Sequence, residues 1–263
     1  MPEEPAVAPE KKRRTIRVPK GARIQVITND GKTSENLGGE SIYIEAGISG
    51  VKRFGGLISE EFLPELRGRR GARIYTEMSS NDGSIGSVIR ATEDLLRSIP
   101  WETEPGGATP DDLEAREFLT TVMSDMSLSW SDFISDVVSM VKYGWDYEEV
   151  VYKLRRGPNG KPPSKYGDGR IGIRKIASRA QDSLLRWELD DNGGVRGMVQ
   201  QALPDFKERF IPIEKAILFR TRRARNNPEG YSFLRASYQP WYMKRSLQEI
   251  EGIGAERDFT GAL

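Results

Sequence analysis

A long helical pattern close to the C-terminus constrains this chain most. Residues 232–259, with the sequence SFLRASYQPWYMKRSLQEIEGIGAERDF, carry apolar side chains at helical spacing. Pro240 removes one backbone hydrogen bond and clashes with the preceding turn. We therefore expect the helix to bend or restart near Ser237 and then to continue to about Asp258. Such a helix needs a packing partner, because most helical stability in proteins comes from burying one face.

The composition limits the possible functions. The chain has 263 residues, of which 37% are hydrophobic and 30% charged, which suffices for one large or two ordinary domains with a real core. Lys and Arg number 40 against 39 Asp and Glu, so the net charge of +1 argues against a tight nucleic-acid binder. Cys and His are both absent from the sequence, which excludes disulfides, thiolate metal sites and His-based catalytic triads. No apolar run approaches the roughly 18 residues of a membrane span, so we expect neither a membrane span nor secretion.

The N-terminal part divides into two segments. Residues 1–15 are mostly Pro, Glu, Ala, Lys and Arg, which predicts a flexible tail. Residues 16–56 carry short alternating apolar runs around Asn29 and Gly38, which predicts a small β-rich element.

Helices are predicted in the middle of the chain. Apolar residues recur at helical spacing over 85–99. Thr109 can cap a second helix that has Pro110 at its first position. A third apolar stripe covers 128–144 and ends at Gly144, a residue suited to the C-terminal cap of a helix.

Strands follow these helices. Residues 145–156 are rich in β-branched and aromatic side chains, and 211–221 form another strand candidate. Residues 182–201 have the pattern of a hairpin that turns at Asn192. Helices, then strands, then a long helix, without βαβ alternation, predict an α+β fold.

The sequence offers one acidic cluster for catalysis. Asp146, Glu148 and Glu149 lie on the first predicted strand, and two of them could form a hydrolytic pair. A solvated strand edge is the interpretation that we favour for these acids. No phosphate-binding loop motif occurs either. We therefore expect no catalytic residues, no cofactor and no bound metal.

The densest charged feature is the segment RTRRAR. Arg220, Arg222, Arg223 and Arg225 could contact phosphate groups non-specifically, or pair with carboxylates of a neighbouring chain. Both interpretations stay open, because the guanidinium group suits either partner.

Three segments occur in an order that is specific in combination. They are YGWDYEEVVY at 143–152, PEGYSFLR at 228–235 and EIEGIGAERDF at 249–259. Together with their surroundings they resemble the portal proteins of tailed double-stranded DNA bacteriophages, in the branch related to the Mu-like portals. The resemblance runs from about residue 56 to residue 263, and residues 1–55 carry none of it.

This resemblance implies a structural protein of the virion and not an enzyme. Portals form a ring, typically of twelve subunits, at one capsid vertex, and the genome passes through it during packaging and ejection. The implied partners are further copies of the chain, the major capsid protein, the terminase large subunit and a head-completion or adaptor protein. Double-stranded DNA would pass through the ring without sequence-specific contacts. The resemblance implies no membrane partner, and the ring would assemble in the host cytoplasm and become part of the virion.

The resemblance also implies a division of the chain as a fragment of the portal fold. Residues 57–228 correspond to the first part of a mixed helix and strand wing domain, 229–260 to the first stem helix and 261–263 to the start of the clip. The second stem helix, tunnel loop and crown of such proteins are not expected within these 263 residues.

A stem helix lies between the equivalent helices of neighbouring subunits, so another copy would be its packing partner. Gly252 and Gly254 would form a smaller face that meets a neighbour, although they could instead only fray the helix end. The apolar candidates for this packing surface are Leu234, Tyr238, Trp241, Tyr242, Leu247, Ile250 and Ile253. The alternative functions are a non-specific DNA-binding structural module, based on the arginine segment, and a hydrolase that uses the acidic cluster.

Overall fold

The computed structural model describes residues 47–261. The elements below all belong to the second of two units, which comprises residues 49–263. The tail predicted for 1–15 lies outside the described residues, as does all but the end of the β-rich element predicted for 16–56.

The helices begin where the sequence supplies caps. Asp82 separates two helices, because its Oδ1 accepts hydrogen bonds from Ser84 N at 3.0 Å and Ile85 N at 3.2 Å. Thr109 forms a capping box with Asp112 at the start of another. The α-helices of the described residues are α1 (Gly68–Asn81), α2 (Gly83–Arg97), α3 (Pro110–Ser124), α4 (Trp130–Tyr143) and α5 (Tyr238–Gly261).

The helices predicted over 85–99, from Thr109 and over 128–144 are confirmed. Helix α1 was missed. Its buried face consists of Gly71, Ala72, Tyr75 and Met78, and the two small residues weaken the apolar pattern in the sequence.

Two three-stranded antiparallel sheets follow the helices. In the first sheet β3 (Trp145–Leu154) lies between β4 (Ile171–Ser178) and β8 (Ala216–Arg220). The second sheet has the order β5 (Leu184–Leu189), β6 (Val195–Gln201) and β7 (Glu208–Pro212). A short ribbon of β1 (Arg53–Phe54) and β2 (Leu57–Ile58) precedes α1.

These helices and strands confirm the predicted α+β class. The strand predicted over 145–156 is β3, and the hairpin predicted over 182–201 is formed by β5 and β6. The single strand predicted over 211–221 is wrong. It is divided between two sheets, because Pro212 has no backbone N–H with which to extend a ladder, and a 3-10 turn at Ile213–Lys215 leads to β8.

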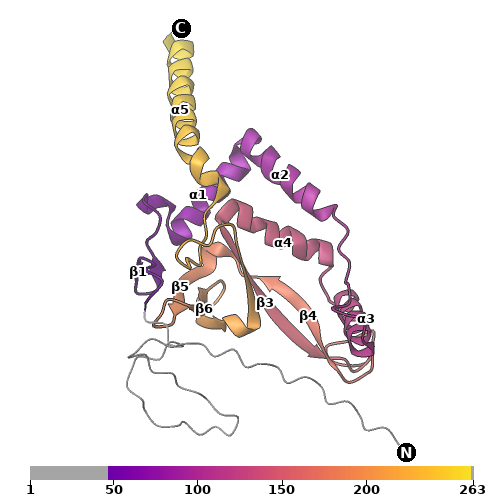
Figure 1. Cartoon of the computed structure of the whole chain (residues 1–263). Helices are drawn as coiled ribbons and strands as arrows, with labels where there is room; N and C mark the ends of the chain where they lie inside the picture. The colour runs from indigo at the N-terminus through magenta and orange to yellow at the C-terminus, as the bar shows by residue number, and fades with distance from the viewer. Residues whose placement is uncertain (1–46, 262–263) are drawn as a thin grey trace, which may run out of the picture. The chain divides into compact units, whose positions relative to one another are not determined.

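Both faces of β3 are covered, so this strand lies at the centre of the core (Figure 1). Trp145 and Tyr147 face the second sheet, where the Trp187 ring packs against them with centroids 5.1 and 5.8 Å away. Tyr147 Oη also donates a hydrogen bond to Ile211 O at 2.9 Å. The opposite face packs against the apolar stripe of α4, which consists of Phe133, Ile134, Val137, Val138 and Val141.

Helix α5 is anchored through its first two turns, where Lys244 and Arg245 also form ion pairs with Asp82 and Glu77. A 3-10 helix at Phe233–Ser237 precedes it, and the α-helix starts at Tyr238 and continues to Gly261, which confirms the restart expected near Ser237. The segment is not helical over 229–232, so the helix begins later than residue 229. Tyr238 and Trp241 are buried against α1, and the rest of α5 leads away from it to the C-terminus (Figure 1).

The anchoring of α5 gives a stability prediction. Trp241 is 8% exposed and Tyr242 is 48% exposed. Replacing Trp241 by Ala should lower the free energy of unfolding of the monomer by about 3 kcal/mol, because it empties the contact with α1. Replacing Tyr242 by Ala should change it by about 0.5 kcal/mol or less. Urea denaturation of both variants tests this, and equal losses would show that α5 is not held by the Trp241 side.

Candidate functional site

Helix α5 carries an apolar face that no described residue covers. Each helical residue turns the chain by 100°, so Ile250, nine residues after Trp241, points away from α1. Ile250 is 65% exposed. We define the open face of α5 as the exposed apolar side chains of Tyr242, Met243, Leu247, Ile250 and Ile253. Soluble proteins rarely expose such a row of large apolar residues without a partner.

The two glycines of α5 do not share one face. Gly252 and Gly254 are two residues apart and therefore point roughly 200° from each other. Gly254 lies beside Ile250 on the open face, whereas Gly252 lies on the side of Trp241. No described atom lies within 4 Å of a Cβ placed at either position. The expected single face of small residues is therefore wrong, and only Gly254 belongs to the open face.

Close contact between two other glycines fixes the start of this helix. A Cβ at Gly144 would lie 2.7 Å from Glu229 O, and one at Gly230 would lie 2.1 Å from Gly144 O. Both glycines also have positive φ angles, of 96° and 57°, which disfavour other residues. Ser232 Oγ adds a hydrogen bond to Lys142 O at 2.6 Å. Contacts with the C-terminal end of α4 therefore fix the position of residues 229–232, from which the chain continues into α5.

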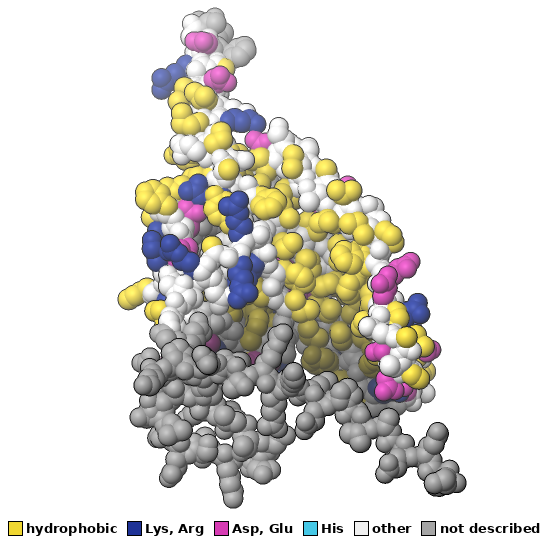
Figure 2. Space-filling view, viewed as in Figure 1, with side chains coloured by type: hydrophobic (Ala, Val, Ile, Leu, Met, Phe, Trp, Pro, Cys, Tyr) yellow, Lys and Arg dark blue, Asp and Glu magenta, His cyan; other side chains and the backbone are white. Residues whose placement is uncertain are grey.

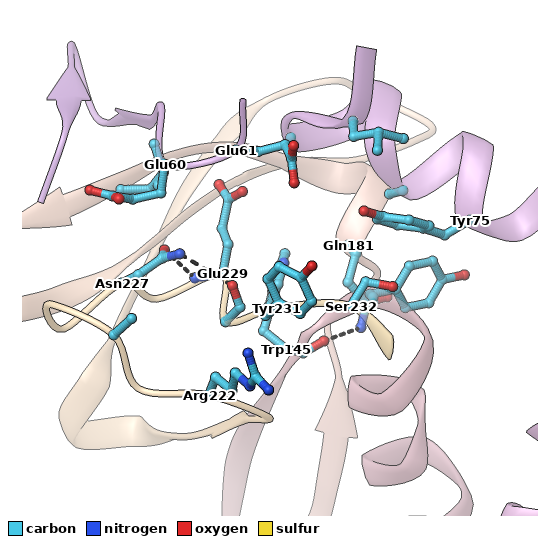
Figure 3. A pocket seen from close by; sticks show the side chains of 17 residues that line it. Glu60, Glu61, Tyr75, Trp145, Gln181, Arg222, Asn227, Glu229, Tyr231 and Ser232 are labelled. Atoms are coloured by element: carbon cyan, nitrogen blue, oxygen red, sulfur yellow. Dashed lines mark hydrogen bonds between the residues drawn. The ribbon is translucent and has the colours of Figure 1, made fainter. Parts of the chain in front are cut away.

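A pocket of about 250 Å³ lies at this junction (Figure 3). The Glu229 carboxyl points into it between Glu60 and Glu61, and Arg222 lies on the other side. Burial raises the pKa of Glu229 to about 7, although Trp187 Nε1 donates a hydrogen bond to its Oε1 at 3.2 Å. The pocket walls come from α1 and from the segment that leads into α5, so the pocket belongs to the base of that helix.

The structure separates the four arginines of the RTRRAR segment. Arg220 lies within β8, where it donates hydrogen bonds to Asn226 Oδ1 and Asn227 O. The guanidinium of Arg225 lies 3.7 Å from the Glu60 carboxylate, and Arg222 lies over the Tyr231 ring. Arg223 is exposed and has no ion-pair partner within 47–261. Arg222 and Arg223 are therefore the members of this segment that are open to an external partner.

Two of the three acids on β3 are buried, so the interpretation as a solvated strand edge is wrong for Asp146 and Glu148. Asp146 and Glu148 have no exposed surface, because β3 is the central strand and α4 covers the face to which both point. Glu149 points to the other side and accepts a hydrogen bond from Arg179 Nε at 2.8 Å. A buried pair cannot reach a dissolved substrate in this conformation, so it does not form a hydrolytic site here.

The environments of the two buried acids differ. Asp146 Oδ1 accepts hydrogen bonds from Ser178 Oγ at 3.0 Å and Gln181 Nε2 at 3.1 Å. No described donor reaches the Glu148 oxygens. Burial, reinforced by the adjacent Asp146 carboxyl, raises the pKa of Glu148 to about 9. Burial therefore favours the protonated form of Glu148 in the folded protein.

Two further properties concern the described residues as a whole. No group of three or more Asp or Glu side chains among them is arranged to hold a metal ion. Within the same residues, no helix combines the length and the hydropathy that crossing a membrane requires.

The raised pKa of Glu148 predicts how stability depends on pH. Between about pH 4.5 and pH 9 the folded state keeps a proton that the unfolded state loses, so stability falls as the pH rises. The slope from this group is at most about 1.4 kcal/mol per pH unit. A Glu148→Gln variant should lose this component when unfolding is followed by urea at several pH values. Glu149→Gln is the control that should keep it, and identical slopes in the parent and Glu148→Gln would contradict the assignment.

Comparison with known families gives one match. Residues 72–257 match the family model described as the portal protein of Mu bacteriophage, from within α1 through most of α5. No curated protein matches the chain. The matched region includes the central β3 sheet and the open face of α5, and it confirms the resemblance seen in the sequence. Because it spans more than half of the 263 residues, the chain belongs to the family of Mu bacteriophage portal proteins.

Proposed function

We propose that the chain is a subunit of a portal ring at one capsid vertex and that α5 is the stem helix through which neighbouring subunits pack. In this proposal residues 57–228 are the first part of the wing, 229–260 the first stem helix and 261–263 the start of the clip. The ring surrounds the channel for genome packaging and ejection, and its role is structural and not catalytic.

The partners follow from the same proposal. The ring contacts the major capsid protein, binds the terminase large subunit during packaging and receives a head-completion or adaptor protein afterwards. Double-stranded DNA passes through it without sequence-specific contacts. The net charge of +1 favours a channel through which DNA passes and argues against tight DNA binding, because phosphate neutralisation by Lys and Arg supplies most non-specific affinity.

The observation that carries the proposal is the open face of α5. A 24-residue helix is about 36 Å long, and it contacts the α1 region through its first two turns. Tyr238 and Trp241 pack against α1, and Lys244 and Arg245 form ion pairs with Asp82 and Glu77. Fully burying an Ile or Leu side chain contributes about 1.5–3 kcal/mol. Leu247, Ile250 and Ile253 therefore supply a strong driving force for association, and a ring places an equivalent helix on each side.

A DNA-binding structural module is the second candidate. Arg223 is exposed without an ion-pair partner among residues 47–261, and a guanidinium binds phosphate well. If replacing Arg222 and Arg223 by Ala leaves assembly unchanged and lowers DNA retention instead, these two residues contact phosphate and not a neighbouring subunit.

A lysine placed on the open face should prevent assembly. Ile250→Lys puts a charge among apolar side chains that association would bury, so the ring fraction seen by light scattering should fall by about tenfold or more. Gln248→Lys is the control, because Gln248 is also exposed and points about 160° away from Ile250, on the side of Trp241. Equal assembly of the two variants would exclude the open face as an interface.

Gly254→Leu separates helix propensity from packing. An added Cβ at this position has no described neighbour within 4 Å apart from the helix's own backbone, so the substitution should raise the monomer stability by up to about 1 kcal/mol through better helix propensity. It should nevertheless weaken the ring, because the side chain occupies space that a neighbour needs. Size-exclusion chromatography with light scattering measures assembly, and thermal melting measures stability. Gly252→Leu controls for added bulk, because it makes the same change on the side of Trp241. Rings of Gly254→Leu as abundant as those of the parent would contradict the placement of Gly254.

A further inference from the structure

Residues 102–117, which include the first half of α3, form a surface with excess negative charge, and we call it the acidic edge. Residues 102–117 contain six carboxylates and one arginine. Arg116 Nε donates to Thr103 O at 3.0 Å, and Thr103 Oγ1 lies 2.6 Å from Thr120 Oγ1, so the preceding loop lies along α3. The exposed acids without an ion-pair partner in the described chain are Glu102, Glu104, Asp111 and Glu117.

Residues 67–73, at the start of α1, form a surface with excess positive charge, and we call it the basic edge. Residues 67–73 contain four arginines and no acid. Arg67 and Arg69 donate to backbone carbonyls, such as Glu61 O at 2.7 Å and Leu184 O at 2.6 Å, which leaves their charges without a carboxylate. Arg70 and Arg73 are exposed and have no ion-pair partner among the described residues.

The two edges lie on opposite sides of the second unit. Figure 2 shows Lys and Arg side chains gathered around α1 and the base of α5, and Asp and Glu gathered on α3. Both edges also expose large apolar side chains. These are Trp101, Leu113 and Leu119 at α3, and Phe62 beside α1. A surface that combines charge with exposed apolar groups is typical of a protein interface.

We propose that the acidic edge at α3 of one subunit docks on the basic edge at α1 of the next subunit. The partner is a second copy of this chain, because the two edges have opposite charge while the whole chain has a net charge of only +1. A head-to-tail contact between different surfaces of identical subunits repeats around an axis and can close a ring. The inference rests on the ring of the proposed function and names the surfaces that would build it.

Two charge-reversed variants test the contact. Variant one carries Glu104→Lys and Glu117→Lys, and variant two carries Arg70→Glu and Arg73→Glu. Each variant alone places like charges against each other at every interface. The assembled fraction, counted by electron microscopy and mass photometry, should fall by about tenfold or more in each.

Mixing the two charge-reversed variants tests whether the acidic and basic edges contact each other. In an equimolar mixture the reversed α3 of variant one meets the reversed α1 of variant two, and the two unchanged edges also match. Alternating rings should therefore form, although neither variant assembles alone. A single chain with all four substitutions should also recover assembly. Melting curves of the separate variants check that they fold, and recovery by mixing cannot arise from misfolded chains.

A control places reversals away from both edges. Asp191→Lys with Lys215→Glu changes two exposed residues, one in the turn between β5 and β6 and one just before β8, and should leave assembly unchanged. Added salt should weaken the parent assembly, because surface charges are screened beyond about 10 Å at 0.1 M.

The outcomes separate this inference from the proposed function. If the parent forms no ring, the proposed function fails and the inference fails with it. If the parent forms rings and both reversed variants assemble equally well, the inference alone is overturned. It is also overturned if the variants fail alone and mixing restores nothing. Normal assembly of variant two with reduced DNA retention would assign the basic edge to phosphate instead.

Discussion

The fold depends on β3, which packs between two different layers. Its odd-numbered residues Trp145 and Tyr147 contact Trp187 of the second sheet, and its even-numbered residues face α4. Because side chains alternate along a strand, a shift of one residue would exchange the two sets. The aromatic side chains would then meet a helix fitted to other residues, so this packing fixes the register of the first sheet. The position of α4, and through Gly144 the origin of α5, follow from it.

The same alternation explains why two carboxyls are buried in a protein of this kind. Asp146 and Glu148 alternate along β3 with Trp145 and Tyr147, and they therefore point into the layer between β3 and α4. A buried carboxyl costs least when it is protonated or hydrogen-bonded. Asp146 is hydrogen-bonded by Ser178 and Gln181, and the raised pKa of Glu148 keeps it neutral. The pair is therefore part of the core.

Different sides of the protein carry different kinds of exposed residues. One side of α5 is used within the chain, where Tyr238 and Trp241 pack against α1, and the other side is left for a partner. Arg70 and Arg73 of α1 and Asp111 and Glu117 of α3 are similarly left without an ion-pair partner among the described residues, and the two groups lie at opposite edges. A subunit with different but complementary surfaces at its edges suits an assembly in which each copy contacts two neighbours.

The sequence by itself determined where helices begin and end, because these features depend on residues close to one another along the chain. The cap at Thr109, the helix end at Gly144 and the restart of the last helix before Pro240 follow from local hydrogen bonding and sterics. Only the tertiary structure decided the rest, because burial depends on contacts distant in sequence. It placed Asp146 and Glu148 in the core, since whether a strand is central or at an edge is set by its neighbours in the sheet. It also decided which side of α5 stays open, because the helical pattern shows two apolar sides and only the contact with α1 selects between them.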